Sequence, residues 1–204
     1  MSAELRLTDR ERDGWVRPDA LDVAPGWLAP IVRATRDVRP DDLSLFLPPP
    51  AGGRQGSVLM LFGQGAGGPD VLIIERARDM RSHAGQPAFP GGAVDPGDDG
   101  AVGAALREAW EETDLDPGGV EVLGALPALW LPPSGFVVSP VVAWWRNPSP
   151  VRVRHPSGYV GPGFTVRGML VWGFTGGILS RIFAAAGLEI GWEPARVVEV
   201  GWSA

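Results

Sequence analysis

The segment from Gly91 to Leu115 constrains the fold most, because it joins a glycine-rich loop to a helix with one acidic side and one apolar side. At about 100° of rotation per residue, Glu108 and Glu112 lie about 40° apart on such a helix, with Glu111 beside them. The apolar positions follow the i, i+3, i+4, i+7 pattern of a buried face: Val102, Ala105, Leu106 and Ala109. The segment therefore predicts an amphipathic helix packed against a core.

The acidic side of this helix points to metal chemistry. Glu108 and Glu112 are like charges at i,i+4, a spacing that costs a helix a few tenths of a kcal/mol, and Arg107 lies four residues before Glu111 to offset part of it. Carboxylate oxygens suit Mg²⁺ or Mn²⁺, which complete their shells with water and substrate phosphates. The alternative is an ordinary solvated acidic face. The glycine-rich loop just before the helix favours a metal and phosphate site.

The run from Gly92 to Leu115 resembles the signature box of the Nudix hydrolases. That box reads Gly, five residues, Glu, seven residues, Arg-Glu-aliphatic-x-Glu-Glu-x-Gly-aliphatic, and the matching positions here are Gly92, Asp98, Arg107, Glu108, Ala109, Glu111, Glu112 and Leu115. Asp98 stands at the position of the first Glu, and the spacer from Asp98 to Arg107 has eight residues. Asp114 replaces the glycine after the helix, and aspartate is among the few residues that adopt the left-handed conformation found at many helix ends.

A second, narrower resemblance lies just upstream. One segment is similar to the motif that marks the coenzyme A pyrophosphatase branch of the Nudix family, through Leu72, Arg76, Ala77, Arg81, Gly85, Phe89, Pro90, Gly91 and Gly92. It departs from that motif at Ile73, which takes the place of a leucine, and at Ile74, which takes the place of a threonine. The likeness continues from Leu131 to Trp145 and from Val171 to Leu179, so it covers most of the chain.

The resemblance implies a fold, an activity and a set of site residues. The fold is an α/β/α sandwich of the Nudix type with a mixed β-sheet. The activity is divalent-metal-dependent hydrolysis of the diphosphate bond of coenzyme A or its derivatives, giving 3′,5′-ADP and 4′-phosphopantetheine. The candidate catalytic residues are Arg107, Glu108, Glu111 and Glu112, with Arg107 orienting Glu111. A Mg²⁺ or Mn²⁺ ion would be held by Glu108, Glu111, Glu112 and Gly92, and substrate by Arg76, Arg81 and Gly91.

Two other functions use the same residues. One is a Nudix pyrophosphatase that acts on ADP-ribose, NADH or dinucleoside polyphosphates, which share the diphosphate. The other is a non-catalytic nucleotide-binding or regulatory module that kept the fold and lost the chemistry. The roles of Arg76 and Arg81 are also open, because a guanidinium can hold phosphate oxygens or simply pair with Glu75 or Asp79.

Composition excludes several other classes of function. The net charge is −6 and all 18 basic residues are Arg, so a duplex nucleic-acid partner is not expected. The absence of Lys removes Schiff-base chemistry and Walker-type phosphate loops. With no Cys there is no disulfide, thiolate nucleophile or Cys-based zinc site, and a cytoplasmic location fits. The N-terminus is charged, unlike a signal peptide, and no apolar run reaches the roughly 18 residues of a membrane span.

We expect the chain to divide into an arm, residues 1–50, that packs on the core, and a Nudix hydrolase domain, residues 51–204. We expect a short helix at Leu28 to Asp37 and a C-terminal helix that includes Ile178 to Ala186. Strands are predicted at Ser57 to Phe62, Val71 to Glu75, Val120 to Leu123, Leu126 to Leu131 and Phe136 to Trp145. The segment between Trp145 and Phe164 is shortened or incomplete relative to the family and holds no carboxylate. Related enzymes are often dimers, and nine Trp are compatible with a homodimer.

Overall fold

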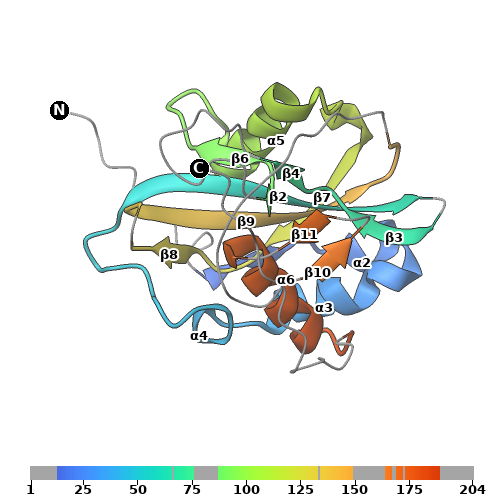
Figure 1. The fold of residues 1–204 in the computed structure, drawn as a ribbon, viewed down its shortest axis with the longest axis horizontal. Helices are drawn as coiled ribbons and strands as arrows, with labels where there is room; N and C mark the ends of the chain where they lie inside the picture. Colours follow the sequence, from blue (N-terminus) through green and yellow to red (C-terminus); the bar gives the residue numbers. More distant parts are fainter. Residues whose placement is uncertain are drawn as a thin grey trace.

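The computed structural model describes residues 13–65, 67–75, 87–132, 134–148, 164–166, 169–171 and 173–188. Figure 1 shows the arrangement of its strands and helices. The strands are β1 (Trp15–Val16), β2 (Arg54–Gly65), β3 (Gly68–Val71), β4 (Ile74–Glu75), β5 (Pro87–Ala88), β6 (Gly91–Ala93), β7 (Val120–Ala125), β8 (Leu129–Leu131), β9 (Phe136–Trp145), β10 (Phe164–Val166) and β11 (Met169–Val171). The helices are α2 (Ala20–Val23), η1 (Gly26–Leu28), α3 (Ala29–Asp37), α4 (Pro40–Leu43), α5 (Gly100–Thr113), η2 (Pro117–Gly119) and α6 (Gly173–Ala185). No helix in these ranges has both the length and the apolar character that a bilayer span requires.

A mixed sheet forms the centre of the described structure. Its strands follow the order β1-β7-β9-β2-β3, with β6 also paired to β2 and β8 to β9. The long strands β2 and β9 are parallel, in a register that runs from Arg54 opposite Phe136 to Phe62 opposite Trp144. The pairs β2–β3, β2–β6, β7–β9 and β8–β9 are antiparallel. Two small antiparallel pairs, β4–β5 and β10–β11, lie outside this sheet.

The central strand β2 is buried on both faces, which explains its continuous apolar sequence. Because side chains alternate along a strand, Met60 and Phe62 enter one apolar cluster while Leu59 and Leu61 enter another. All four are at most 3% exposed. An apolar run without polar alternation is typical of a strand with helices on both sides.

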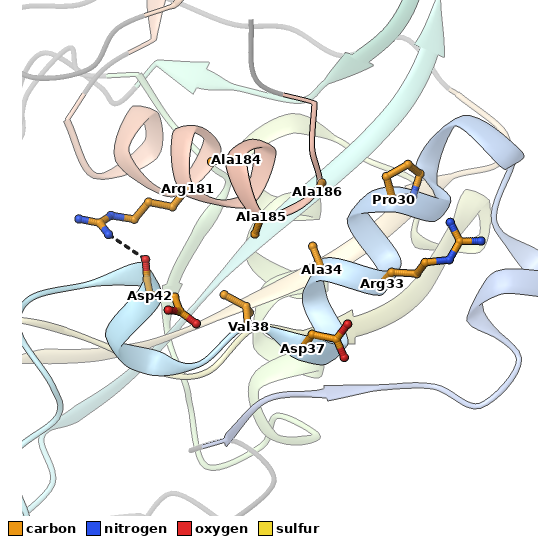
Figure 2. A pocket seen from close by; sticks show the side chains of 10 residues that line it. All are labelled: Pro30, Arg33, Ala34, Asp37, Val38, Asp42, Arg181, Ala184, Ala185 and Ala186. Atoms are coloured by element: carbon orange, nitrogen blue, oxygen red, sulfur yellow. Dashed lines mark hydrogen bonds between the residues drawn. The ribbon is translucent and has the colours of Figure 1, made fainter. Parts of the chain in front are cut away.

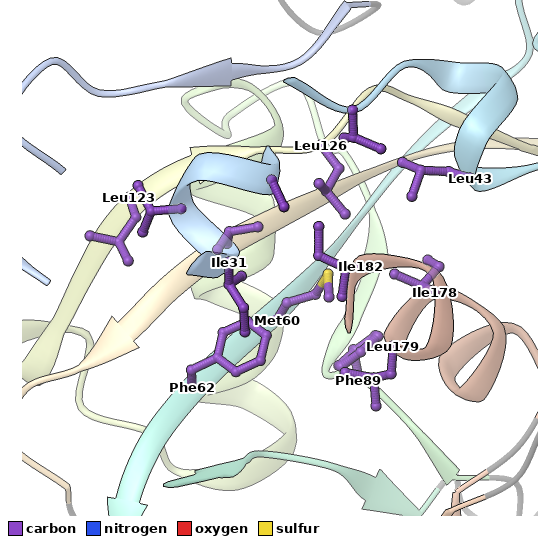
Figure 3. Close-up of a cluster of buried hydrophobic side chains, with 14 of the residues drawn as sticks. Ile31, Leu43, Met60, Phe62, Phe89, Leu123, Leu126, Ile178, Leu179 and Ile182 are labelled. Atoms are coloured by element: carbon purple, nitrogen blue, oxygen red, sulfur yellow. The ribbon is translucent and has the colours of Figure 1, made fainter. Parts of the chain in front are cut away.

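Helices α3 and α6 cover one face of the sheet, and α5 covers the other (Figure 1). On the first face, Ile31 of α3 and Ile182 of α6 meet Met60 of β2 (Figure 3). On the second face, Ala105 and Ala109 of α5 pack in the cluster of Leu59 and Leu61. The predicted α/β/α arrangement with a mixed sheet is therefore confirmed.

Most of the predicted elements are present. The helix expected at Leu28 to Asp37 is α3, the C-terminal helix is α6, and the strand expected at Phe136 to Trp145 is β9. The helix with the acidic side is α5, and its end confirms the role given to Asp114, which has φ 58° and donates its backbone N–H to Trp110 O at 2.9 Å.

Two predicted strands are wrong in extent. The run from Val71 to Glu75 is not one strand, because the chain leaves β3 after Val71 and Ile74 then pairs with Ala88 in a separate small sheet. In the run Leu126 to Leu131 only β8 is a strand. Pro127 has no N–H to donate to a ladder, and the Leu126 N–H donates instead to Pro140 O at 2.9 Å.

Residues 13–50 pack on the sheet rather than standing apart from it. Strand β1 pairs with β7, and Leu28, Ile31 and Val32 are at most 2% exposed in the first cluster. The Trp27 indole N–H also donates to Gln64 Oε1 at 2.8 Å, at the β2–β3 turn. The division at residue 50 stays a prediction. Residues 149–163, which make up most of the segment expected to be shortened or incomplete, lie outside the described residues.

Candidate active site

The short strand β6 brings the glycine-rich loop against the centre of the sheet. It pairs antiparallel with β2, with Val58 opposite Gly91 and Ser57 opposite Gly92. The approach is so close that a Cβ at Gly91 would overlap the Ser57 carbonyl oxygen and lie 2.7 Å from Val58 Cα. Only glycine fits at Gly91 without displacing the neighbouring strand.

Helix α5 carries its carboxylates to this strand. The apolar face holds it on the sheet, since Ala104, Ala105 and Ala109 are fully buried. The Glu108 side chain, 18% exposed, lies directly over Gly92, where a Cβ would overlap Glu108 Oε1 and lie 2.7 Å from Oε2. The lack of a side chain at Gly92 therefore creates the space that the Glu108 carboxylate occupies.

Glu112 reaches the same strand one turn later. Its Oε2 accepts a hydrogen bond from the Gly91 N–H at 3.0 Å. Glu111, by contrast, points away toward Arg107, and its side chain is 46% exposed. The structure thus brings Glu108 and Glu112 to the Gly91–Gly92 strand and leaves Glu111 at the edge of the site.

Arg107 links the loop to two of the three carboxylates. Its Nη1 donates to Glu108 Oε1 at 3.0 Å and to Glu111 Oε2 at 3.2 Å, as the i,i+4 spacing to Glu111 predicts. Its Nη2 donates to the carbonyl oxygen of Ala93 at 3.0 Å, just after the glycine pair. The guanidinium therefore holds the loop and the acidic face of α5 in one arrangement.

The strongest partner of Arg107 is Asp98, whose role the sequence did not reveal. Arg107 Nε donates to Asp98 Oδ1 at 2.9 Å and Nη2 donates to Oδ2 at 3.0 Å, which is the bidentate geometry of a strong ion pair. The Asp95 N–H also donates to Asp98 Oδ2, at 2.7 Å, and the Asp98 side chain is only 6% exposed. The sequence signal was present, because Asp98 occupies the position of the first acidic residue of the box.

This pairing shifts the ionisation of both groups. The hydrogen bonds from Arg107 hold the pKa of Asp98 below its ordinary value, against the opposing effect of burial. The same pair raises the pKa of Arg107, with Glu108 contributing further hydrogen-bonding and charge. The ion pair therefore favours the ionised form of Asp98.

We predict that Asp98→Asn lowers the free energy of unfolding by about 2 kcal/mol near neutral pH, because it weakens a charged bidentate pair. The folded-state pKa of Asp98 is depressed, so its contribution is present above the unfolded pKa of about 3.9 and is lost as pH falls through the lower folded pKa. Urea unfolding over a series of acidic pH values should show a shallower loss of stability below about pH 4 in the variant than in wild type. An equal loss of stability with falling pH in the two proteins would contradict the proposed contribution of Asp98.

The three glutamates do not converge in this arrangement. Among the described residues, no three His, Asp or Glu side chains are grouped so as to hold one metal ion. Glu108 and Glu111 each share one oxygen with Arg107, while Glu108 Oε2 and Glu111 Oε1 make no hydrogen bond to the described part of the chain. The donor set is nevertheless one of hard carboxylate oxygens beside a strand without side chains, and this chemistry fits Mg²⁺ or Mn²⁺.

Arg76 and Arg81 fall in residues 76–86, outside the described residues, so their expected role in substrate binding stays a prediction. The metal-ligand roles of Glu108, Glu111, Glu112 and Gly92 also stay predictions.

Comparison with known proteins agrees with the fold. Residues 53–148 match the family model described as NUDIX domain. The fold is of the Nudix α/β type, and residues 53–148 are similar to a NUDIX domain.

Among curated proteins, the chain is similar to "Uncharacterized Nudix hydrolase NudL" of Escherichia coli (strain K12 / DH10B), 51% identical over 74 residues, or 36% of this chain and 38% of that protein. The protein of the same description in Salmonella paratyphi B is 53% identical over the same shares. The match thus spans 38% of these relatives' own length. Among solved structures, the Nudix hydrolase RenU of M. smegmatis is 18% identical, covering 69% of this chain and 94% of that one, with a TM-score of 0.46.

Proposed function

We propose that this protein hydrolyses the diphosphate bond of a nucleotide-containing small molecule with the help of Mg²⁺ or Mn²⁺. The observation that carries the proposal is the contact of Glu108 and Glu112 with the Gly91–Gly92 strand. Anionic ligands are gathered there beside a backbone that no side chain shields. The similarity to Nudix hydrolases over this part of the chain supports the same reaction class.

The chain's own residues have distinct parts in this reaction. Glu108, Glu111 and Glu112 would hold the cation, with Glu108 and Glu112 closest to the glycine strand. A divalent ion bound there supplies neutralisation of the diphosphate charge and activation of a water molecule. Arg107 is a positioning residue, because it orients Glu108 and Glu111 while Asp98 and the Ala93 carbonyl fix its guanidinium.

We further propose coenzyme A or one of its derivatives as the substrate, cleaved to 3′,5′-ADP and 4′-phosphopantetheine. This finer assignment rests on the resemblance of the segment from Leu72 to Gly92 to the coenzyme A pyrophosphatase branch. Within that segment the described residues Phe89 and Pro90 support the site physically. Phe89 is 2% exposed in the first apolar cluster, and Pro90 O accepts the Leu59 N–H at 2.8 Å, which anchors the glycine pair to β2.

A substrate panel tests both levels of the proposal. The purified chain is incubated with Mg²⁺ or Mn²⁺ and coenzyme A, ADP-ribose, NADH or diadenosine tetraphosphate, and the products are identified by mass spectrometry. We expect coenzyme A to be cleaved with the highest kcat/KM, giving the two products named above. A preference for ADP-ribose would overturn the proposal that coenzyme A is the substrate, but it would leave the proposed hydrolysis of a diphosphate bond intact. Tight binding of these compounds by calorimetry without any cleavage would overturn the class and favour a binding module.

A further inference from the structure

A cation and an aromatic ring lie together where β2 and β9 begin. The Arg54 guanidinium lies over the Phe136 ring, with Cζ 4.6 Å from the ring centroid. The two residues are Cα partners in the parallel register, so their side chains share one face of the sheet. Phe136 is partly exposed, whereas Val137 and Val138, which follow it, are buried. The Arg54–Phe136 pair therefore lies at the surface, at the end of the buried part of β9.

A glycine lets this ring lie beside the candidate active site. A Cβ at Gly56 would lie 2.8 Å from Phe136 Cδ1 and 3.1 Å from the Gly92 carbonyl oxygen. The lack of a side chain at Gly56 therefore allows the ring to rest on the backbone of β2, and the ring and the Gly92 carbonyl border the same point of that strand. Gly56 belongs to the part of β2 that pairs with β6. The Arg54–Phe136 pair thus adjoins the strand that carries the proposed cation site.

The hydrogen-bonding capacity of the Arg54 guanidinium is unused. The side chain is exposed, and it makes no hydrogen bond or ion pair within the described part of the chain. Arg107, which also lies near the glycine strand, is by contrast engaged by Asp98 and by two glutamates. A planar guanidinium with free N–H groups matches the oxygens of a phosphate, and the ring beneath it restricts its orientation. Arg54 is therefore suited to bind an anionic group of the substrate.

The position of Arg54 on β2 indicates which anionic group it meets. Side chains of β2 alternate between the two faces of the sheet, and Arg54 lies on the face of Met60, whereas α5 and its carboxylates lie on the face of Leu59. Arg54 is also three residues, or roughly 10 Å, along β2 from Ser57, which pairs with the glycine strand. A diphosphate held at the glutamates is therefore separated from Arg54, whereas a phosphate on the far side of the attached ribose can reach it.

We propose that Arg54, held in place by the Phe136 ring, binds a phosphate monoester on the ribose of the substrate. This inference rests on the proposed function, because the diphosphate at the cation site sets where the ribose lies. It names the substrate class as diphosphates whose nucleoside carries a further phosphate. Coenzyme A has such a phosphate at the ribose 3′ position, whereas ADP-ribose and NADH do not. Arg54 is thus a specificity-determining residue that takes no part in cleaving the diphosphate bond.

Calorimetric titration of the metal-free full chain with 3′,5′-ADP and with 5′-AMP tests the proposal, because the two nucleotides differ by one phosphate. We expect wild type to bind 3′,5′-ADP at least about tenfold more tightly, and Arg54→Gln to reduce this preference to less than about twofold. Arg33→Gln is the matched control, since Arg33 is also exposed but lines the groove between α3, α4 and α6 (Figure 2); it should keep the wild-type preference. Equal affinity of wild type for the two nucleotides, no measurable binding of 3′,5′-ADP, or the same preference in both variants would overturn the proposal.

Steady-state kinetics separate this inference from the proposed function. With Mg²⁺ present, Arg54→Gln should lower kcat/KM for coenzyme A at least about tenfold more than kcat/KM for 3′-dephospho-coenzyme A. Equal kcat/KM of wild type for the two compounds would overturn the role of Arg54 and leave the proposed hydrolysis intact. If neither compound is cleaved, the proposed function fails, and the metal-free titrations still show whether Arg54 binds the ribose phosphate.

Discussion

Replacing Glu112 with glutamine is expected to lower turnover by on the order of 100-fold while the protein stays folded. The glutamine amide oxygen can still accept the hydrogen bond from the Gly91 N–H, which is 3.0 Å in the wild type. The variant therefore keeps the contact between helix and strand and loses the negative charge proposed to hold the cation. Steady-state kinetics with Mg²⁺ and the best substrate of the panel measure the effect, and calorimetric titration with Mn²⁺ measures the expected loss of metal affinity directly.

The stability of the fold should change little. Glu112→Gln removes the like-charge pair with Glu108 at i,i+4, and it also weakens the charge-assisted hydrogen bond from the Gly91 N–H, so two effects of opposite sign act on the free energy of unfolding. Glu121→Gln is a suitable control, because Glu121 lies on β7 and pairs with Arg17 and Arg146; its turnover should match wild type. If Glu112→Gln turned over at the wild-type rate, the acidic face of α5 would be ordinary surface and the proposed reaction would lose its main support.

The parts of the fold that the sequence predicts well are those set by local periodicity. The helix with apolar residues at helical spacing is α5, and its four predicted apolar positions include the fully buried Ala105 and Ala109. The continuous apolar runs are β2 and β9, which are buried on both faces. These patterns are visible because burial imposes the repeat of a helix or strand on neighbouring residues.

Features that depend on distant pairings could not be read in this way. The parallel register of β2 and β9 joins segments more than seventy residues apart, for example Arg54 with Phe136. The break between β3 and β4 arises because Ile74 takes a partner in another sheet, which no local pattern encodes.

The contacts within the candidate site could be predicted from the sequence only in part. The sequence indicated that Arg107 pairs with Glu111, but not that Asp98 binds the same guanidinium through both oxygens. It also predicted three carboxylates on one side of α5 without showing that Glu108 and Glu112, rather than Glu111, contact the glycine strand. Side-chain competition of this kind depends on distances that helical periodicity alone does not fix.

Replacing Gly91 with alanine is expected to lower the free energy of unfolding by about 3 kcal/mol, the upper end of the usual cost of forcing an extra carbon into a packed site. The added Cβ would meet the Ser57 carbonyl oxygen and Val58 Cα, and both belong to the backbone of β2. A flexible side chain could rotate away, but β2 is held by β6 on one edge and by β9 on the other. The strands must therefore separate to accept the methyl group. Urea denaturation followed by circular dichroism measures the loss.

Gly97→Ala separates this steric effect from the general cost of removing a glycine. A Cβ at Gly97 would meet nothing within 4 Å, so the free energy of unfolding should change by less than about 1 kcal/mol. Because β6 carries both the Gly91 N–H and the space for Glu108, displacement of this strand should also reduce turnover at temperatures where Gly91→Ala is still folded. Equal stability of the two variants would mean that β6 does not approach β2 as closely as described, and the contact of Glu108 and Glu112 with the glycine strand would fail with it.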